Sequence, residues 1–387
     1  MKRKYKWQQK RFIEKIYKKR NEWFDHLQIK KIKLTESKNQ KNHRIAEIID
    51  EYTMILNDNR THLGMTSSDL VDNCRILWLR EEEGKIREQF FGVVKELSRL
   101  IEKNKGIPIV GRTHLKIATL TTIGYRFAPT FEVLLGLLKG KLRLQAKGIG
   151  GSVGTGSADR EIGGKERFDE VFLAPTQFAK NQTSNMMGEL NFIIWISTIS
   201  ANLHKICLDI RLMVGLNEMK IENNGVGSTA MPHKGTNPWR FEKACSLFRM
   251  IPKNIQIIYD DIMMNMLERS LDNQTNLQIC LEEAITHFKD GMIEMEKGLD
   301  VLEINQKQIK KDIKNNRGDI MSEIKLTRLI KNGENRDKAR HIVISDKGTG
   351  FPLKTIIGDA EIKTIILIED FKRLEKLIIK KSNEYEK

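Results

Sequence analysis

The chain has 387 residues, of which 40% are hydrophobic, enough to bury a core and to exclude a wholly disordered protein. With 67 Lys and Arg against 51 Asp and Glu it carries a net charge of +16, and its 7 Pro argue against an all-β or loop-rich fold. The four cysteines lie far apart without a CxxC pair, which argues against a zinc knuckle or a disulfide scaffold and favours a reducing compartment.

The basic excess is concentrated at the start of the chain, where residues 1–42 hold 15 Lys and Arg against 4 Asp and Glu. Such a segment can contact nucleic acid, or it can steer an anionic small substrate. No RNA-binding or DNA-reading motif accompanies the charge. We therefore interpret it as a solvated helix face and expect no nucleic-acid partner. Because no apolar segment follows the charged start, we also expect no signal peptide.

Helical periodicity dominates the chain. Apolar residues recur at helical spacing in six segments: 9–26, 70–104, 118–146, 187–220, 238–265 and 272–302. Helices of this length with short connections predict an extended bundle. The apolar stretch Leu190–Leu203 is interrupted by polar residues and falls short of the roughly 18–20 residues of a membrane span, so no membrane association is expected. The one modest strand candidate is His341–Ser345.

A change of composition near residues 303–320 indicates a domain boundary. We predict an all-α protein of three parts. Residues 1–69 form an N-terminal helical domain with the basic arm, residues 70–303 form a long central helical bundle, and residues 304–387 form a small C-terminal helical domain.

The loop from Gly225 to Pro238 is the most informative segment for function. Ser228 follows two glycines, so it can swing over a substrate, and nearby N–H groups and a lysine can lower its pKa enough for it to act as a base. Lys234 and Asn237 can hold a carboxylate. A surface loop without function is the alternative interpretation.

Two further segments combine histidine with hydroxyl groups. Thr113 and His114 precede a predicted helix, where a histidine can be held in one tautomer and donate a proton; a histidine satisfied by hydrogen bonds at a helix start is the alternative. In the segment from His62 to Asp69, Thr66 or Ser67 can bind an anion at a helix N-terminus or simply cap the helix.

These segments, in this order, resemble the signatures of the fumarase/aspartase superfamily, and within it the adenylosuccinate lyase family. The matching stretches are HLGMTSSDLVDN, GRTHLKIATLTTIGYRFA, GSTAMPHKGTNP, the LERSLDN run that begins at Leu267, and LHKICLDIRL, which begins at Leu203. The resemblance covers residues 43–345 and implies a long central helical bundle. It also implies a homotetramer in which each active site is shared between subunits.

The resemblance assigns roles to individual residues. His114 matches the histidine that protonates the leaving nitrogen, Ser228 the base, and Glu242 the carboxylate that orients the catalytic histidine. The implied substrate-binding residues are His43, His62, Thr66, Ser67, Thr113, Gln182, Lys234, Asn237 and Arg269.

Two glutamines depart from the family pattern. Where the family holds the nucleotide phosphate with a Ser and an Arg, this chain has Gln274 and Gln278, and a lost Arg–phosphate contact removes roughly 1.5–3 kcal/mol. The motif around His43 also differs, and the loop after Lys234 carries one extra residue. Two alternatives follow: a superfamily lyase that releases fumarate from a succinyl compound without a nucleotide, or a non-catalytic homologue.

The resemblance implies a carbon–nitrogen lyase of purine nucleotide biosynthesis. The expected reaction is a β-elimination that releases fumarate, converting adenylosuccinate to AMP and SAICAR to AICAR. No metal-ligand cluster appears in the sequence, and we expect neither a metal nor an organic cofactor. The expected partners are a small nucleotide substrate and further copies of the chain, and the expected location is the cytoplasm.

Overall fold

The computed structural model describes residues 10–30, 44–162, 176–222, 230–231, 236–345 and 352–385. The chain divides into two compact units, each built from three stretches of sequence. Unit 1 comprises Met1–Arg87, Lys141–Thr198 and Met250–Phe288. Unit 2 comprises Glu88–Gly140, Ile199–Arg249 and Lys289–Lys387. These units cut across the three sequence ranges proposed above, so that division stays a prediction.

Three long helices contribute residues to both units: α3 (Ser67–Lys103), α7 (Met187–Gly215) and α10 (Asn273–Leu299). The other elements of unit 1 are α1 (Lys10–His26), α2 (Arg44–Leu56), the 3-10 helix η2 (Gly151–Val153), α5 (Ser157–Glu161) and α9 (Lys253–Met263). Helix α1 follows its predicted periodicity, because one apolar stripe along it is buried: Phe12, Ile13, Ile16, Tyr17 and Phe24.

Unit 2 combines helices with two short antiparallel ribbons. Its helices are α4 (Ile123–Lys139), α8 (Trp239–Met250), α11 (Gln306–Asn315), α12 (Arg317–Lys331), α13 (Arg336–Ser345), α14 (Leu353–Ile356) and α15 (Ala360–Tyr385). One ribbon pairs β1 (Pro108–Thr113) with β2 (Lys116–Thr122), and the other pairs β3 (Met219–Ile221) with β4 (Leu302–Ile304). The prediction of an all-α protein is confirmed, since the strands of the described residues are few and short.

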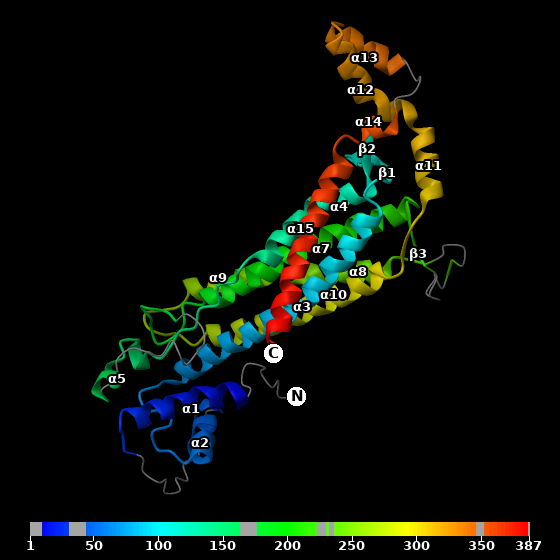
Figure 1. Cartoon of the computed structure of the whole chain (residues 1–387). Coiled ribbons are helices and arrows are strands. Elements are labelled where there is room, and N and C mark those ends of the chain that lie inside the picture. The colour runs from blue at the N-terminus through cyan, green and yellow to red at the C-terminus, as the bar shows by residue number, and fades with distance from the viewer. Residues whose placement is uncertain are drawn as a thin grey trace. The chain divides into compact units, whose positions relative to one another are not determined.

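The β1–β2 hairpin packs against helices near the C-terminus, and Figure 1 shows it beside α11, α12 and α14. Val110 and Leu120 from the two strands share a buried apolar cluster with Ile320 and Met321 of α12 and with Ile356 of α14. Burial of these side chains anchors the hairpin on the helices.

Three predicted elements were wrong in part. The helix expected over 118–146 begins as strand β2, because Ile117 and the following threonines are β-branched and suit a strand. The helix expected over 238–265 is two helices, α8 and α9, since Pro252 cannot donate a hydrogen bond in a helix interior. The strand candidate His341–Ser345 lies in α13, where Asn335 accepts the N–H of Asp337 at 2.9 Å before the helix and Ala339 is buried.

Within the described ranges, one helix is long and apolar enough to cross a membrane by length and composition alone. This is α7, and 56% of its most apolar window is buried inside the protein. A buried core helix passes the same test.

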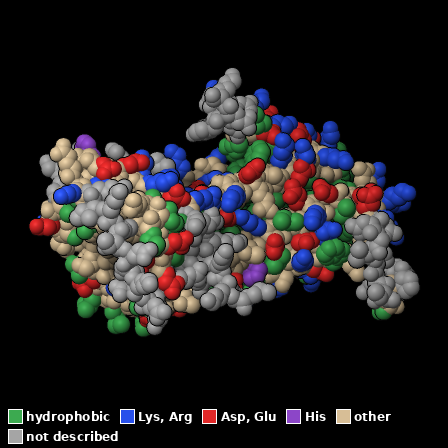
Figure 2. All heavy atoms as spheres, turned by 90° about the horizontal axis from the view of Figure 1, so that it is seen from below, with side chains coloured by type: hydrophobic (Ala, Val, Ile, Leu, Met, Phe, Trp, Pro, Cys, Tyr) green, Lys and Arg blue, Asp and Glu red, His purple; other side chains and the backbone are tan. Residues whose placement is uncertain are grey.

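Basic and acidic side chains are interspersed on the face of the molecule drawn in Figure 2. Among the described residues, many basic and acidic side chains form ion pairs, such as Lys18 with Glu14 at 2.6 Å and Lys95 with Glu375 at 2.7 Å. In the described residues, neighbouring carboxylates therefore partly neutralise the positive side chains.

Candidate active site

A buried carboxylate fixes the start of α3, in unit 1. The Oδ2 atom of Asp69 accepts hydrogen bonds from the backbone N–H of Thr66 at 2.7 Å and from its hydroxyl at 3.1 Å. The N–H of Asp69 donates to the carbonyl of Thr66 at 3.0 Å, and a negative charge is favourable at a helix N-terminus. The helix begins at Ser67, and the carboxylate of Asp69, rather than the hydroxyl of Thr66 or Ser67, is the group that accepts hydrogen bonds at this start.

Lys147 joins this helix start to a segment far away in sequence. Its Nζ donates to Oδ1 of Asp69 at 2.5 Å and to the backbone carbonyl of Gln182 at 2.6 Å, and Lys147 and Asp69 are both fully buried. The N–H of Gly150 also donates to Oδ1 of Asp69, at 2.9 Å. A buried charge needs such partners, so this ion pair holds Thr66 and Gln182 in the same region of unit 1.

Gln182 and Arg269, two residues expected to bind substrate, contact each other directly. Nη1 of Arg269 donates to Oε1 of Gln182 at 2.6 Å, while Nε2 of Gln182 donates to the carbonyl of Ser152 at 2.7 Å. The backbone N–H of Gln182 donates to the carbonyl of Glu268 at 3.1 Å. Contacts therefore run without a break from Thr66 through Lys147 and Gln182 to Arg269.

His62 lies in the same unit and is held from α1. Its Nδ1 is 3.0 Å from the hydroxyl of the buried Tyr17, and its backbone has a positive φ of 72°. Burial lowers the pKa of His62 to about 4; the charge of Asp69 opposes this shift and that of Arg20 adds to it. The imidazole is therefore neutral at physiological pH and can act as a hydrogen-bonding group rather than as a cation.

Arg20 of α1 secures the turn that follows His62. Its Nη2 donates to the carbonyl of Leu63 at 3.0 Å, and the guanidinium forms a buried ion pair with Asp159 of α5. Gly64 has a φ of +70°, and a Cβ there would lie 3.0 Å from Oδ1 of Asp159. The turn therefore requires glycine both for its backbone conformation and for the close approach of this ion pair.

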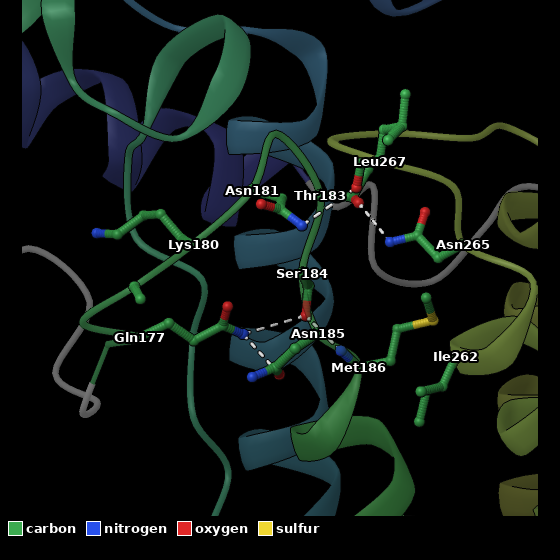
Figure 3. Close-up of a pocket in the computed structure, with 11 residues that line it drawn as sticks. Gln177, Lys180, Asn181, Thr183, Ser184, Asn185, Met186, Ile262, Asn265 and Leu267 are labelled. Atoms are coloured by element: carbon green, nitrogen blue, oxygen red, sulfur yellow. Dashed lines mark hydrogen bonds between the residues drawn. The ribbon is translucent and has the colours of Figure 1, made fainter.

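A cavity of about 420 Å³ with both polar and apolar lining adjoins this cluster in unit 1. In Figure 3, Gln177 points towards Ser184 and Asn185, and its Nε2 donates to Oδ1 of Asn185 at 2.8 Å. Lys180 points away from the other labelled side chains (Figure 3). The lining residues are Gln177, Ala179, Lys180, Asn181, Thr183, Ser184, Asn185, Met186, Ile262, Asn265 and Leu267. Because most of these groups are neutral carboxamides and hydroxyls, the cavity suits an uncharged hydrogen-bonding group.

The two glutamines that depart from the family pattern lie at the start of α10. Gln274 accepts a hydrogen bond from Nη2 of Arg75 at 3.1 Å, and Nη1 of Arg75 donates to the buried Glu189 at 3.1 Å. Gln278, one turn later, is only 7% exposed, and its amide nitrogen has no hydrogen-bond partner among the described residues. The cation next to Gln274 thus comes from α3 and is already paired with a carboxylate.

His114 lies at the tip of the β1–β2 hairpin, in unit 2. Thr113 pairs with Lys116, so His114 and Leu115 form a two-residue turn, and their φ values are 52° and 62°. Two positive φ values match the right-handed twist of a tight hairpin but strain residues other than glycine. The expectation that His114 stands at a helix start was wrong. The hairpin instead exposes Thr113 and His114 to solvent.

Glu242 and Asn237 lie in and just before α8, also in unit 2. Glu242 is half exposed, with a carboxylate oxygen 3.8 Å from Nη2 of Arg211, and its N–H donates to the carbonyl of Pro238 at 3.1 Å. Asn237 is exposed beside a shallow pocket that Ile221 also lines. Within the described part of the chain, no hydrogen bond or ion pair joins Glu242 to His114, and the interaction expected between them stays a prediction.

The expected site residues thus fall into two groups. Unit 1 holds His62, Thr66, Ser67, Gln182 and Arg269, and contacts through Asp69 and Lys147 connect three of them: Thr66, Gln182 and Arg269. Unit 2 holds Thr113, His114, Asn237 and Glu242. The predictions for His43, Ser228 and Lys234 concern residues outside the described ranges.

Sequence reasoning missed the groups that assemble the unit 1 cluster. Asp69 carried a signal, since an acidic residue three positions after a threonine is typical of a capped helix start. The local sequence gave no signal for Lys147, Tyr17 or Arg20, because each of these residues acts through a partner far away in sequence. In the described ranges, no group of three or more His, Cys, Asp or Glu side chains is placed to hold a metal ion, and the four cysteines are buried and free.

A protein-family model described as lyase matches residues 6–256, well over half of the chain. The chain therefore belongs to this lyase family, and its recognition as a member of the fumarase/aspartase superfamily is confirmed.

Among curated proteins, the chain is similar to adenylosuccinate lyases. It is 30% identical to that of Schistosoma mansoni over 58% of this chain and 50% of the relative. It is 29% identical to that of Methanothermobacter thermautotrophicus over 81% of this chain and 73% of the relative. The matched part spans about half to three-fifths of the length of several curated relatives.

A solved structure shares the fold. The crystal structure of 3-carboxy-cis,cis-muconate lactonizing enzyme from Pseudomonas putida superposes with a TM-score of 0.71, at 19% identity, over 85% of this chain and 81% of that one. The similarity supports the all-α architecture.

Proposed function

We propose that the chain is a carbon–nitrogen lyase that cleaves adenylosuccinate to AMP and fumarate by β-elimination. The same chemistry would convert SAICAR to AICAR, which places the chain in purine nucleotide biosynthesis. The proposal rests on membership of the lyase family, on the similarity to adenylosuccinate lyases, and on the site residues described above.

The proposed reaction divides proton transfer between two residues. Ser228 removes a proton from the succinyl carbon next to a carboxylate, which produces an aci-carboxylate dianion. Lys234, Asn237 and loop N–H groups stabilise that charge. The electron pair then forms the double bond of fumarate as the C–N bond breaks, and His114 protonates the departing nitrogen.

One observation carries the proposal: the contacts from Thr66 through Lys147 and Gln182 to Arg269. These four residues come from four segments that are far apart in sequence, and a purely structural role does not require a threonine, a glutamine and an arginine to meet. Together they supply hydroxyl, amide and guanidinium groups, which are suited to the oxygens of a carboxylate-bearing substrate.

A turnover assay tests the proposal. The chain is incubated with adenylosuccinate, SAICAR and succinyl compounds without a nucleotide, and fumarate is followed by its ultraviolet absorbance. Ser228→Ala should lower the rate by about 10²–10⁴-fold, and His114→Gln should lower kcat more than it changes KM. Ser322→Ala is the matched control, because that exposed hydroxyl bonds only the carbonyl of Asp319. A chain that releases fumarate from none of these compounds is not a lyase of this type.

A second candidate substrate is a succinyl compound without a phosphate. Gln274 and Gln278 favour it, because both are neutral and the nearby Arg75 is engaged by Glu189. Turnover of a non-nucleotide compound with no turnover of adenylosuccinate would support this candidate instead.

We also propose that the chain works as a homotetramer with shared active sites, in the cytoplasm. Exposed apolar side chains in unit 1 support an assembly, since soluble monomers rarely expose such a group together. They are Met263, Met264, Met266, Leu267 and Leu271, on both sides of Arg269.

A further inference from the structure

A buried carboxylate interacts with the hairpin that carries His114. Glu218 follows α7 and is fully buried. Its Oε2 accepts a hydrogen bond from Nη1 of Arg126 at 3.1 Å, and its Oε1 lies 3.6 Å from Nη2 of Arg112. One carboxylate is therefore shared by two guanidinium groups in the interior of unit 2.

One arginine lies within the hairpin near its tip, and the other lies in the helix that follows the hairpin. Arg112 lies in β1, two residues before His114, and Arg126 lies in the first turn of α4, directly after β2. Nη2 of Arg126 also donates to the carbonyl of Val110 in β1, at 2.7 Å. Glu218 thus connects the end of α7 to the incoming strand and to the helix that follows the outgoing strand.

The hairpin needs such support because its own ladder is interrupted. The register shifts between Val110 and Arg112, and at Gly111 a Cβ would lie 2.5 Å from the carbonyl of Thr119. A bulge of this kind redirects a strand and leaves residues unpaired. The strained turn at His114 and Leu115 lies just beyond it.

We propose that Glu218 is a positioning residue for His114: by holding Arg112 and Arg126, it fixes the direction in which the hairpin presents the imidazole. The inference rests on the proposed function only in that His114 is the proton donor. Misplacing a catalytic group by about 1 Å is enough to cost on the order of 10²-fold in rate, so a contact with Arg112, two residues before His114, can control turnover.

Glu218→Gln tests the inference, because it keeps the size of the side chain and removes its charge. Glu294→Gln is the matched control. Glu294, also in unit 2, accepts hydrogen bonds from two cations at 3.0 Å each, but these are Arg240 and Lys243 of α8.

The first measurement is amide hydrogen exchange of the peptide 108–122, which needs no activity. We expect exchange about tenfold faster in Glu218→Gln and unchanged in Glu294→Gln.

The second measurement is the split between kcat and KM for fumarate release. We expect Glu218→Gln to lower kcat by about 10–100-fold with KM within about twofold, and Glu218→Asp, which keeps the charge, to recover part of the loss. If Glu218→Gln does not fold, Arg126→Lys gives a milder test, because it retains a cation for Glu218 but loses the fixed fork that also reaches Val110.

The outcomes separate this inference from the proposed function. Unchanged exchange in the hairpin would overturn the positioning role whether or not the chain is active. Faster exchange with an unchanged kcat would also overturn it, because the contact would then hold the hairpin without affecting His114. A wild-type chain without fumarate release would instead contradict the proposed function, and hydrogen exchange would still decide whether Glu218 holds the hairpin.

Discussion

At the scale of single residues, buried polar groups determine the chemistry available in unit 1. His62 is kept neutral by its surroundings, and Tyr17 fixes one of its ring nitrogens. A neutral imidazole can donate one hydrogen bond and accept another. With Nδ1 engaged by Tyr17, Nε2 is left for a ligand.

The shifted pKa of His62 makes stability depend on pH. The pKa is about 4 in the folded chain and 6.5 ordinarily, so between these values the unfolded chain binds a proton that the folded chain does not. The contribution of His62 to the free energy of unfolding is therefore complete above pH 6.5. It is lost as the pH falls towards 4, by up to about 1.4 kcal/mol per pH unit. We would measure the free energy of unfolding in urea at several pH values. Between pH 4 and 6.5 this free energy should change less steeply with pH in His62→Gln than in the wild type. His26→Gln, at an exposed position, should keep the wild-type slope; equal slopes in all three proteins would contradict the prediction.

The Lys147–Asp69 pair should dominate the stability of the unit 1 cluster. Lys147→Met leaves the carboxylate of Asp69 buried without its cation, and we expect a loss of about 3–5 kcal/mol in the free energy of unfolding. Adding Asp69→Asn should cost less than the sum of the two single changes, because it removes the stranded charge. Lys139→Met is the control: its pair with Asp370 is half exposed, so the expected loss is below about 1 kcal/mol. Similar losses for both lysines would argue against a special role for Lys147.

At the scale of elements, the β1–β2 hairpin is the part of unit 2 that carries the proposed proton donor. Its strands share a core with α12 and α14, while its tip is exposed and strained. Strain at an exposed histidine is consistent with a functional constraint on that turn. The hairpin therefore combines a rigid base with a tip that is open to substrate.

Leu115→Gly should raise the melting temperature, because Leu115 is 70% exposed and adopts a φ of 62° that glycine reaches without strain. We expect a gain of roughly 0.5–1 kcal/mol, since the relief of left-handed strain exceeds the added entropy of the unfolded chain. Leu115→Ala is the matched variant: it also removes the side chain but keeps the strain. Equal melting temperatures for the two variants would show that the turn is not strained.

At the scale of the whole molecule, the expected residues are divided between two units of the chain. The cluster of unit 1 offers groups that bind, and unit 2 carries His114 and Glu242. In the homotetramer proposed above, residues from different copies of the chain could form one site.

Mixing inactive variants tests shared sites. Ser228→Ala and His114→Gln are each expected to be inactive, but a mixed tetramer can form some sites in which both residues are wild type. After dissociation and reassembly, the mixture should release fumarate at least about tenfold faster than either variant alone. A mixture as inactive as its components would place both residues in one copy, and sedimentation of the wild type as a monomer would exclude the tetramer.

Much of this protein follows from local sequence. The long helices were predicted because apolar residues repeat with the helical period over many turns, and α1, α3, α7 and α10 begin within three residues of the expected positions. The signature segments were recognised because they are contiguous in the chain. Membership of the lyase family followed from them and is confirmed.

The tertiary structure decided what depends on partners far apart in sequence. His114 stands on a hairpin rather than at a helix start: the β-branched residues of β2 permit a strand, and packing of Val110 and Leu120 against α12 and α14 stabilises it over the helix that the pattern also allowed. Lys147 became part of the site only when the fold buried it against Asp69 and the carbonyl of Gln182. The composition of a segment fixes its local preference, but a buried charge is stable only beside its partner, and that partner is chosen by the fold.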